Sequence, residues 1–259
     1  MEGGIRMSDL KIEQIVGHRG FGLAAPENTY LSLDRSSQLG LSYVEYDVRL
    51  TRDNISVVSH DNSLLRCARN ESLISELTYN ELASINIAEY YALEDLHQNI
   101  PTFEEYFDYA SGLGLISQIE LKPEKGHEER LAKEVSLILG SKLFKNPENQ
   151  IPLITSFDAL ALTMFKEHSS HPIQTGILVE PKEVVSWQDK AEKANADYVH
   201  FHALYLKDDI CSHIREKGFK INGFHINHPV VAVNAIRSGC ERFTCDIPEI
   251  FMKFIEQTD

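Results

Sequence analysis

The sequence predicts an α/β protein in which eight parallel strands close into a (β/α)8 TIM barrel. Short apolar runs alternate with helical patterns along the chain, which is the order typical of parallel α/β proteins. The length of 259 residues fits one undivided barrel of this kind. Polar side chains also follow the predicted strands directly, and a parallel barrel carries its active site at that edge.

Nine segments have the composition of strands. They are Glu13–Gly17, Tyr43–Arg49, Ile55–Ser59, Leu115–Leu121, Leu153–Ser156, Gln174–Val179, Asp197–Phe201, Lys220–Ile226 and Arg242–Cys245. Only residues 50–54 separate the second segment from the third, which is too short for a parallel crossover but enough for a hairpin turn. Asn54 tolerates the left-handed conformation that such a turn needs. We therefore expect a β-hairpin after the second strand, which leaves eight barrel strands.

Helical patterns lie between these strands. They are Asn28–Leu39, Tyr79–Ile85, Phe103–Ala110, Glu128–Leu139, Leu160–His168, Trp187–Ala194, Lys207–Glu216, Val230–Ser238 and Pro248–Ile255. The segment 62–113 carries about one helix more than a crossover requires, so we expect a small helical insertion over the rim of the barrel. Residues 1–10 are expected to form a loose leader and residues 11–259 a single catalytic domain.

Charge and composition exclude several classes of partner. Lys and Arg total 25 against 39 Asp and Glu, a formal charge of −14, which disfavours nucleic acid and anionic membranes. No stretch approaches 18 apolar residues and no secretory signal is visible, so no membrane span is expected. Four cysteines without a CxxC pair favour a reducing compartment, and we expect a cytoplasmic protein.

Three carboxylates in two strands predict a metal site. Glu45 and Asp47 are two residues apart in a strand, so their side chains point to the same face. Glu120 and Lys122 have the same spacing in the next barrel strand. Adjacent interior carboxylates repel one another unless a cation or protons intervene. An all-oxygen donor set suits one divalent cation, Mg²⁺ or Ca²⁺, and argues against structural zinc.

Two histidines and two cationic side chains stand beside these carboxylates. His18 and Arg19 follow the first strand, and the hairpin register puts His60 opposite Glu45 or Tyr46. Two histidines that flank a metal can act as an acid–base pair at neutral pH. Arg19 and Lys122 supply the positive charge that phosphate oxygens need. Any one of these residues could be structural, but together they come from three consecutive β units, as a shared site requires.

Other polar positions have structural interpretations. Asn28 or Thr29 can cap the helix that follows, and Glu27 could reach the site indirectly. His200 and His202 alternate around Phe201, and one of them is expected to point into the barrel. That residue could line the pocket, but we favour a hydrogen-bonded interior histidine. Trp187 is expected to serve in helix packing.

These residues resemble the glycerophosphodiester phosphodiesterase family, within the phospholipase-C-like phosphodiesterase barrel superfamily. The resemblance covers the chain from about Glu13 and is carried by ordered motifs. They are His18-Arg19-Gly20, Pro26-Glu27-Asn28-Thr29, Glu45-Tyr46-Asp47-Val48, Thr51-Arg52-Asp53, His60-Asp61, Ile100-Pro101-Thr102-Phe103-Glu104-Glu105, Glu120-Leu121-Lys122, Ser156-Phe157 and Thr244-Cys245-Asp246-Ile247-Pro248. The last motif carries one residue more than the family's Thr-Asp-x-Pro signature.

The resemblance implies a role for each of these residues. Glu45, Asp47 and Glu120 would bind the cation. His18 and His60 would be the acid–base pair, and we assign proton donation to the leaving alkoxide to His60. Arg19 and Lys122 would lie near the phosphate. The substrate implied is a glycerophosphodiester, hydrolysed to glycerol 3-phosphate and an alcohol, in lipid or glycerol metabolism.

Two segments depart from the family pattern. Leu65-Arg66-Cys67-Ala68 replaces the family's Asp-Arg-Thr-Thr, and Phe224-His225-Ile226-Asn227 replaces Trp-Thr-Val-Asn. Phe224 can still stack on a glycerol or headgroup, whereas His225 is unusual. Both departures concern the pocket for the leaving group rather than the chemistry.

Two other functions stay open. A related lyase would stop at a cyclic phosphate, and it should show an apolar rim for a membrane or a secretion signal. A barrel that only binds a ligand should lack a metal carboxylate or a histidine, and this chain has all five. The nucleophile can be water or the substrate's 2-hydroxyl. The sequence leaves the preferred alcohol, the choice between Mg²⁺ and Ca²⁺ and the oligomeric state open.

Overall fold

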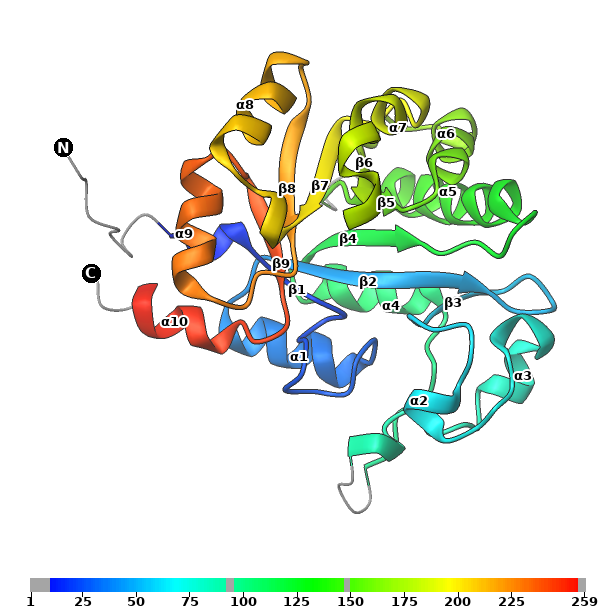
Figure 1. Cartoon of the computed structure of the whole chain (residues 1–259). Coiled ribbons are helices and arrows are strands. Elements are labelled where there is room, and N and C mark those ends of the chain that lie inside the picture. Colours follow the sequence, from blue (N-terminus) through cyan, green and yellow to red (C-terminus); the bar gives the residue numbers. More distant parts are fainter. Residues whose placement is uncertain (1–9, 92–95, 147–149, 256–259) are drawn as a thin grey trace.

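Eight parallel strands form a closed barrel in this computed structural model, which describes residues 10–91, 96–146 and 150–255. The sheet order is β1-β9-β8-β7-β6-β5-β4-β2-β3, and β1 also pairs with β2, which closes the barrel (Figure 1). The strands are β1 (Ile15–Gly17), β2 (Tyr43–Leu50), β3 (Ser56–Val58), β4 (Ile116–Leu121), β5 (Leu153–Ser156), β6 (Thr175–Val179), β7 (Tyr198–His202), β8 (Lys220–Phe224) and β9 (Arg242–Cys245). The predicted (β/α)8 barrel is confirmed.

Helices surround the barrel and separate its parallel strands (Figure 1). They are α1 (Tyr30–Leu39), α2 (Leu65–Ala68), α3 (Tyr79–Leu82), α4 (Phe103–Gly112), α5 (Glu128–Lys145), α6 (Ala159–His168), α7 (Trp187–Lys193), α8 (Asp208–Glu216), α9 (Pro229–Arg237) and α10 (Glu249–Ile255). The largest difference from the sequence prediction is in α5, which continues to Lys145 instead of ending at Leu139. The polar residues after Leu139 hide this extension, although Leu143 is buried.

The third strand turns back beside the second, as the short connection predicted. Val48 pairs with Val58 in an antiparallel ladder, and Asn54 has a positive φ of 63° in the turn. The backbone N–H of Ser59 donates to the carbonyl of Asp47 at 3.0 Å. This bond places Ser59 opposite Asp47, so that His60 follows opposite Tyr46, as the sequence predicted.

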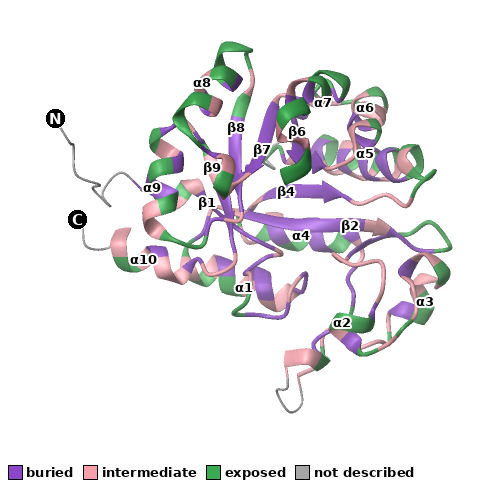
Figure 2. Ribbon diagram, in the orientation of Figure 1, coloured by how far each residue is buried: buried purple, intermediate pink, exposed green. Residues whose placement is uncertain are grey.

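The barrel strands are almost entirely buried, and their two faces have different roles (Figure 2). On the outer face of β2, Tyr46 packs edge-on against Tyr106 of α4 with ring centroids 4.8 Å apart. On the inner face, Glu45 and Asp47 are 3% and 0% exposed. Because alternate residues point to opposite faces, the strand anchors the helices with one set and presents carboxylates inside with the other.

The segment between β3 and α4 carries α2, α3 and two 3₁₀ turns, Ile74–Glu76 and Glu89–Tyr91. Together with Val57 of β3, its apolar side chains form a small hydrophobic cluster apart from the main barrel core. The buried members are Val57, Leu64, Ala68, Ile74, Leu82, Ile87 and Ile100. We call this segment the excursion. It leaves the barrel directly after β3 and begins with the residues that include His60 (Figure 1).

The start of the chain departs from the prediction in one respect. Residues 1–9 of the expected leader lie outside the described residues, and Leu10 is 3% exposed and packs in the main core. Residues Ile12–Gln14 form a 3₁₀ helix, so β1 begins at Ile15 rather than at Glu13. A three-residue strand is enough because parallel neighbours pair with it on both sides.

Three further expectations can be compared with the described residues. Trp187 is buried and contacts the rings of Phe201 and Phe219, which confirms its packing role. The cysteines at 67, 211, 240 and 245 are free thiols, as expected without a disulfide framework. Among the helices described, none has the length and apolar character needed to cross a membrane.

Candidate active site

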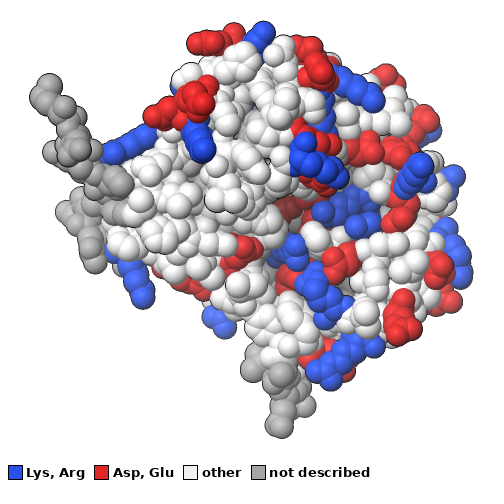
Figure 3. Space-filling model, viewed as in Figure 1, with Lys and Arg blue, Asp and Glu red and all other residues white. Residues whose placement is uncertain are grey.

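Charged side chains of both signs gather around a hollow on one face of the molecule, whereas much of the remaining surface in that view is uncharged (Figure 3). Phe224 ends β8, whereas the predicted carboxylates, histidines and cations come from β1, β2 and β4 and the residues that follow them and from the segment after β3. These strands are neighbours in the barrel, since β2 pairs with β1, β3 and β4. The topology therefore brings together what the sequence separates by about a hundred residues.

The three carboxylates converge. One oxygen from each of Glu45, Asp47 and Glu120 lies within 4.8 Å of the others. Asp47 of β2 pairs in register with Glu120 of β4, which places their side chains at the same height inside the barrel. Glu45 lies one step lower on the same face, where its Oε2 accepts a hydrogen bond from the Arg19 backbone N–H at 3.1 Å. Its Oε1 has no hydrogen-bond partner, and neither has Oδ1 of Asp47.

Crowding in a buried site perturbs all three carboxyl groups. Burial raises the pKa of Glu45 well above its usual range, and the charges of Asp47 and Glu120 raise it further. Burial and the Asp47 charge also raise the pKa of Glu120, against the opposing effect of Lys122. Asp47 is different, because Lys122, His60 and Arg19 outweigh burial and lower its pKa. Without a cation, keeping all three carboxylates ionised here costs free energy, because they are buried and repel one another.

Two cationic side chains border the carboxylates. Nζ of Lys122 lies 2.7 Å from Oε1 of Glu120 and 3.4 Å from Oδ1 of Asp47. Nη1 of Arg19 donates to Oε1 of Glu27 at 3.0 Å, while its buried Nε has no hydrogen-bond partner and lies 3.9 Å from Asp47. Arg19 can therefore still donate one hydrogen bond into the site. The structure places both predicted cations at the site.

His18 is held in one orientation by β9. Its Nδ1 lies 2.5 Å from Oδ1 of Asp246, and Nδ2 of Asn227 donates to the other oxygen of Asp246 at 2.7 Å. These two hydrogen bonds outweigh burial and lower the pKa of Asp246, so it stays ionised. Nε2 of His18 is left facing Oε2 of Glu45 at 3.9 Å.

The turn after β1 brings Asp246 close. Gly22 has a positive φ of 66°, and a Cβ atom there would lie 2.0 Å from the carbonyl oxygen of Asp246. Only glycine allows the two segments to approach so closely. The backbone N–H of Leu23 then donates to the same carbonyl at 2.8 Å. The glycine thus supports the contact between His18 and Asp246.

His60 belongs to a network in which basic and acidic side chains alternate. Its Nδ1 lies 2.7 Å from Oδ1 of Asp61, and the other oxygen of Asp61 lies 2.6 Å from Nε of Arg66. Arg66 also binds Glu27, which in turn binds Arg19. Burial lowers the pKa of His60, and the attraction of Asp47 offsets this only in part because Lys122 and Arg19 act in the same direction as burial. This network connects His60 with Arg19 through Arg66 of the excursion.

Asn28 and Thr29 divide the two tasks considered for them. Thr29 caps α1, because its side chain accepts a hydrogen bond from the backbone N–H of Ser32. Asn28 instead points into the site, where its Nδ2 donates to Oδ2 of Asp47 at 3.0 Å. Its φ of 57° is a conformation that asparagine tolerates better than most residues. The capping interpretation is correct for Thr29 only.

The aromatic side of the site comes from β7 and β8. Phe224 is 8% exposed and packs edge-on against the rings of Phe157, His202 and His225. His225 follows it directly and lies with its ring centroid 4.0 Å from that of His18. The pKa of His225 falls to about 4, mainly because the ring is buried; His18 and Arg19 act in the same direction and Asp246 opposes them, so the imidazole is neutral at pH 7.

The interior histidine of β7 differs from its prediction. His200 is fully buried, but neither ring nitrogen has a hydrogen-bond partner, so the expected hydrogen-bonded residue is not found. Gly176 on the paired strand makes room for the ring, since a Cβ atom there would lie 2.5 Å from Nε2. Burial lowers the pKa of His200 to about 3. Strand periodicity placed the side chain correctly, but it carries no information on partners.

The fold and this site define the class: the protein is a (β/α)8-barrel phosphodiesterase, a hydrolase. A family model described as the glycerophosphoryl diester phosphodiesterase family matches residues 18–250, which is nearly the whole described chain. The chain therefore belongs to the glycerophosphoryl diester phosphodiesterase family. This confirms the resemblance seen in the ordered motifs.

Individual relatives agree with the family model. The YhdW protein of Bacillus subtilis is 28% identical over 92% of this chain and 96% of its own length. A glycerophosphodiester phosphodiesterase of Caldanaerobacter subterraneus subsp. tengcongensis is 24% identical over 94% of this chain and 98% of its own. Among solved structures, an Oleispira antarctica phosphodiesterase in complex with its product sn-glycerol 3-phosphate has a TM-score of 0.84 and 29% identity, covering 94% of this chain and 96% of that one.

Several site residues were missing from the sequence prediction. Asp61 and Arg66 orient His60, and Asp246 orients His18. Asp61 and Asp246 stand at strand ends, and Arg66 lies in a segment that departs from the family pattern. Each position is therefore noticeable in the sequence, but the sequence does not indicate that these residues contact the histidines. Their partners lie up to 228 residues away in sequence, and such distances become visible only in the fold.

Proposed function

We propose that the protein hydrolyses glycerophosphodiesters to glycerol 3-phosphate and an alcohol, with one divalent cation and the two histidines His18 and His60. The observation that carries this proposal is the convergence of three buried carboxylates between the two histidines. The relative that is solved with sn-glycerol 3-phosphate supports the choice of product.

The donor atoms fit a hard cation. Oε1 of Glu45 and Oδ1 of Asp47 are buried oxygens without a hydrogen-bond partner, as expected of atoms reserved for an ion. Glu120 adds a third oxygen, and the set contains no sulfur or nitrogen, which suits Mg²⁺ or Ca²⁺. When bound, the cation supplies Lewis acidity at a phosphoryl oxygen and neutralises the carboxylates.

His18 has the geometry of a general base. Its Nδ1 proton is donated to Asp246, so the lone pair of Nε2 faces the carboxylate cluster. From there it can accept a proton from a water molecule or from the substrate's 2-hydroxyl. Asp246 stabilises the imidazolium that forms, because it remains ionised when the ring becomes positive.

His60 stands on the hairpin side and would protonate the leaving alkoxide. Asp61 holds its Nδ1, which leaves Nε2 to donate the proton. Arg19 offers its unpartnered Nε, and Lys122 its ammonium group, to the phosphoryl oxygens. Phe224 would pack against the glycerol or headgroup, since it lies at the aromatic side of the same site.

Steady-state hydrolysis of a panel of glycerophosphodiesters, with and without EDTA, tests this proposal. Release of glycerol 3-phosphate that stops on chelation and returns with Mg²⁺ or Ca²⁺ is the expected result. Phosphorus NMR of the products distinguishes the related lyase, which would accumulate a cyclic phosphate. Absence of turnover on every diester would instead indicate a barrel that only binds its ligand.

A further inference from the structure

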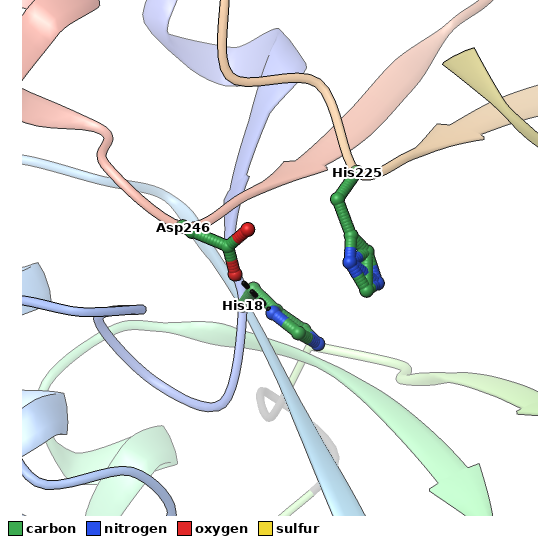
Figure 4. A group of neighbouring side chains, drawn as sticks. All are labelled: His18, His225 and Asp246. Carbon is green, nitrogen blue, oxygen red and sulfur yellow. Dashed lines mark hydrogen bonds and ion pairs between the residues drawn. The ribbon is translucent and has the colours of Figure 1, made fainter. Parts of the chain in front are cut away.

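Three side chains of the rim form a second cluster beside the carboxylates, with Nε2 of His18 3.9 Å from Oε2 of Glu45. His18 follows β1, His225 follows β8 and Asp246 follows β9, and β9 lies between the other two strands in the barrel. One potential ligand atom from each residue lies within 4.8 Å of the others. Figure 4 shows His18 between Asp246 and the ring of His225. Zn²⁺ binds histidine nitrogen at about 2.0–2.1 Å and carboxylate oxygen at about 2.0–2.2 Å.

His225 is available as a ligand. Within the described part of the chain its ring contacts the rings of His18 and Phe224 but makes no hydrogen bond. Histidine at this position departs from the family motif noted in the sequence, where threonine stands. Asp246 is ionised and faces His18 from the opposite side. Two imidazoles and one carboxylate thus each offer a ligand atom within 4.8 Å of the other two.

The donor set separates this cluster from the carboxylate site. Two nitrogens and one oxygen suit a borderline-soft ion such as Zn²⁺, whereas three oxygens suit Mg²⁺ or Ca²⁺. Three protein ligands also leave a position open for water, as in mononuclear zinc sites. The rim therefore offers two neighbouring places that select different ions.

We propose that His18, His225 and Asp246 bind Zn²⁺ or a similar transition ion, and that this ion inhibits the enzyme by occupying its general base. The inhibitory step rests on the proposed function of His18, whereas binding of the ion does not. A metal on Nδ1 displaces the proton shared with Asp246 to solvent, and Nε2 takes up a proton from solvent. The ring stays neutral, but it has no lone pair left for the nucleophile's proton.

Binding is measured first, without reference to turnover. Metal-free protein is saturated with Mg²⁺ and then titrated with Co²⁺, whose visible absorption reports histidine ligation, and Zn²⁺ uptake is measured in parallel. We expect one additional ion per chain. Losing even an outer partner of a metal ligand lowers affinity by about 10–100-fold, so His225→Ala and His225→Gln should each bind at least about tenfold more weakly.

His202→Ala is the matched control, because His202 is a rim histidine of the adjacent strand that lies outside the cluster. It should bind Co²⁺ like the natural protein. Equal Co²⁺ affinity of the natural protein and both His225 variants would overturn the proposal, and so would a Co²⁺ spectrum without histidine ligation. Thermal unfolding confirms that each variant is folded.

Inhibition is then measured at saturating Mg²⁺, relative to the uninhibited rate of each variant. Buffered Zn²⁺ should inhibit the natural protein, and the His225 variants should need at least about tenfold more Zn²⁺. Equal sensitivity of all proteins would show displacement of Mg²⁺ and overturn the inhibitory step. If Zn²⁺ binds and turnover stays complete, the assignment of His18 as the general base is overturned. If no turnover is seen at any metal concentration, the proposed hydrolysis is contradicted, but the Co²⁺ binding result still stands.

Discussion

The side-chain amide of Asn28 donates to Oδ2 of Asp47 at 3.0 Å, and both residues are buried. The bond occupies one oxygen of the carboxylate and leaves Oδ1 for another partner. Asn28 thus fixes how Asp47 is presented to the site. It is a positioning residue, since it acts through Asp47.

Replacing Asn28 should weaken cation binding more than it slows turnover. In Asn28→Gly, which accepts the positive φ of 57°, we expect about 10–100-fold weaker Mg²⁺ affinity with kcat largely recovered at saturating Mg²⁺. Titration of activity with Mg²⁺ separates the two effects. A drop in kcat that no concentration of Mg²⁺ restores would contradict the positioning role. Asn54→Gly, another positive-φ asparagine in the hairpin turn, is the control for backbone flexibility.

Neutralising Glu45 should stabilise the chelated protein and inactivate the enzyme. Burial and two neighbouring carboxylates already raise the pKa of Glu45, so Glu45→Gln removes repulsion. Relief of about 1 kcal/mol raises the Tm of a domain of this size by about 2–4 °C. Activity should fall at least about 100-fold, since a donor oxygen is lost. Calorimetry in EDTA measures the Tm, and a diesterase assay measures the activity. Glu71→Gln on the surface is the control. An unchanged or lower Tm of Glu45→Gln would refute the repulsion argument.

The two histidines should respond differently to the leaving group. His18→Ala and His60→Ala are each expected to lower kcat by about 10²–10⁴-fold on an alkyl diester, the range for a general acid or base. A nitrophenolate is a far weaker base than an alkoxide and scarcely needs protonation. On a nitrophenyl diester His60→Ala should therefore be partly rescued and His18→Ala should not. Rescue of His18→Ala alone would reverse the assignment.

His200 should make the fold sensitive to acid. Its pKa is about 3 in the folded protein but about 6.5 when unfolded, so between these values the unfolded chain binds more protons. The free energy of unfolding should then fall by up to about 1.4 kcal/mol per pH unit as the pH drops from about 6.5 towards 3. Urea unfolding at several pH values tests this. His200→Leu should flatten the profile relative to His127→Gln, an exposed histidine, and parallel profiles would exclude His200 as the cause.

Local sequence patterns predicted the barrel well because each strand carries its own signal. All nine predicted strands are present with ends shifted by no more than two residues, and the five residues between β2 and β3 fixed the hairpin. Hydrophobic periodicity missed only short or polar pieces, such as the four-residue α2. A single helical turn depends on its neighbours for stability, so its sequence holds little evidence of it.

The site residues that lie on strands could be predicted from strand periodicity, whereas those that depend on contacts between distant segments could not. The two-residue spacing of Glu45 and Asp47 placed both inside the barrel, and the structure brings them to Glu120. By contrast, the sequence offers Asn28 as a helix cap and Arg66 only as part of a segment that departs from the family pattern. The partner of Asn28, Asp47, lies on another element, and Arg66 reaches Asp61 from the separate helical turn α2; no local periodicity encodes either contact.

Because the excursion has its own hydrophobic cluster, it can unfold locally while the barrel stays folded. His60 follows β3, whose Val57 packs into that cluster, and Arg66 lies within the excursion itself. The carboxylates instead belong to β2 and β4, which the main core holds. Regions with few buried contacts open at lower free energy than the rest of a protein. Warming should therefore release His60, the proposed proton donor, before the three carboxylates separate, so that inactivation is reversible well below the temperature at which the barrel unfolds.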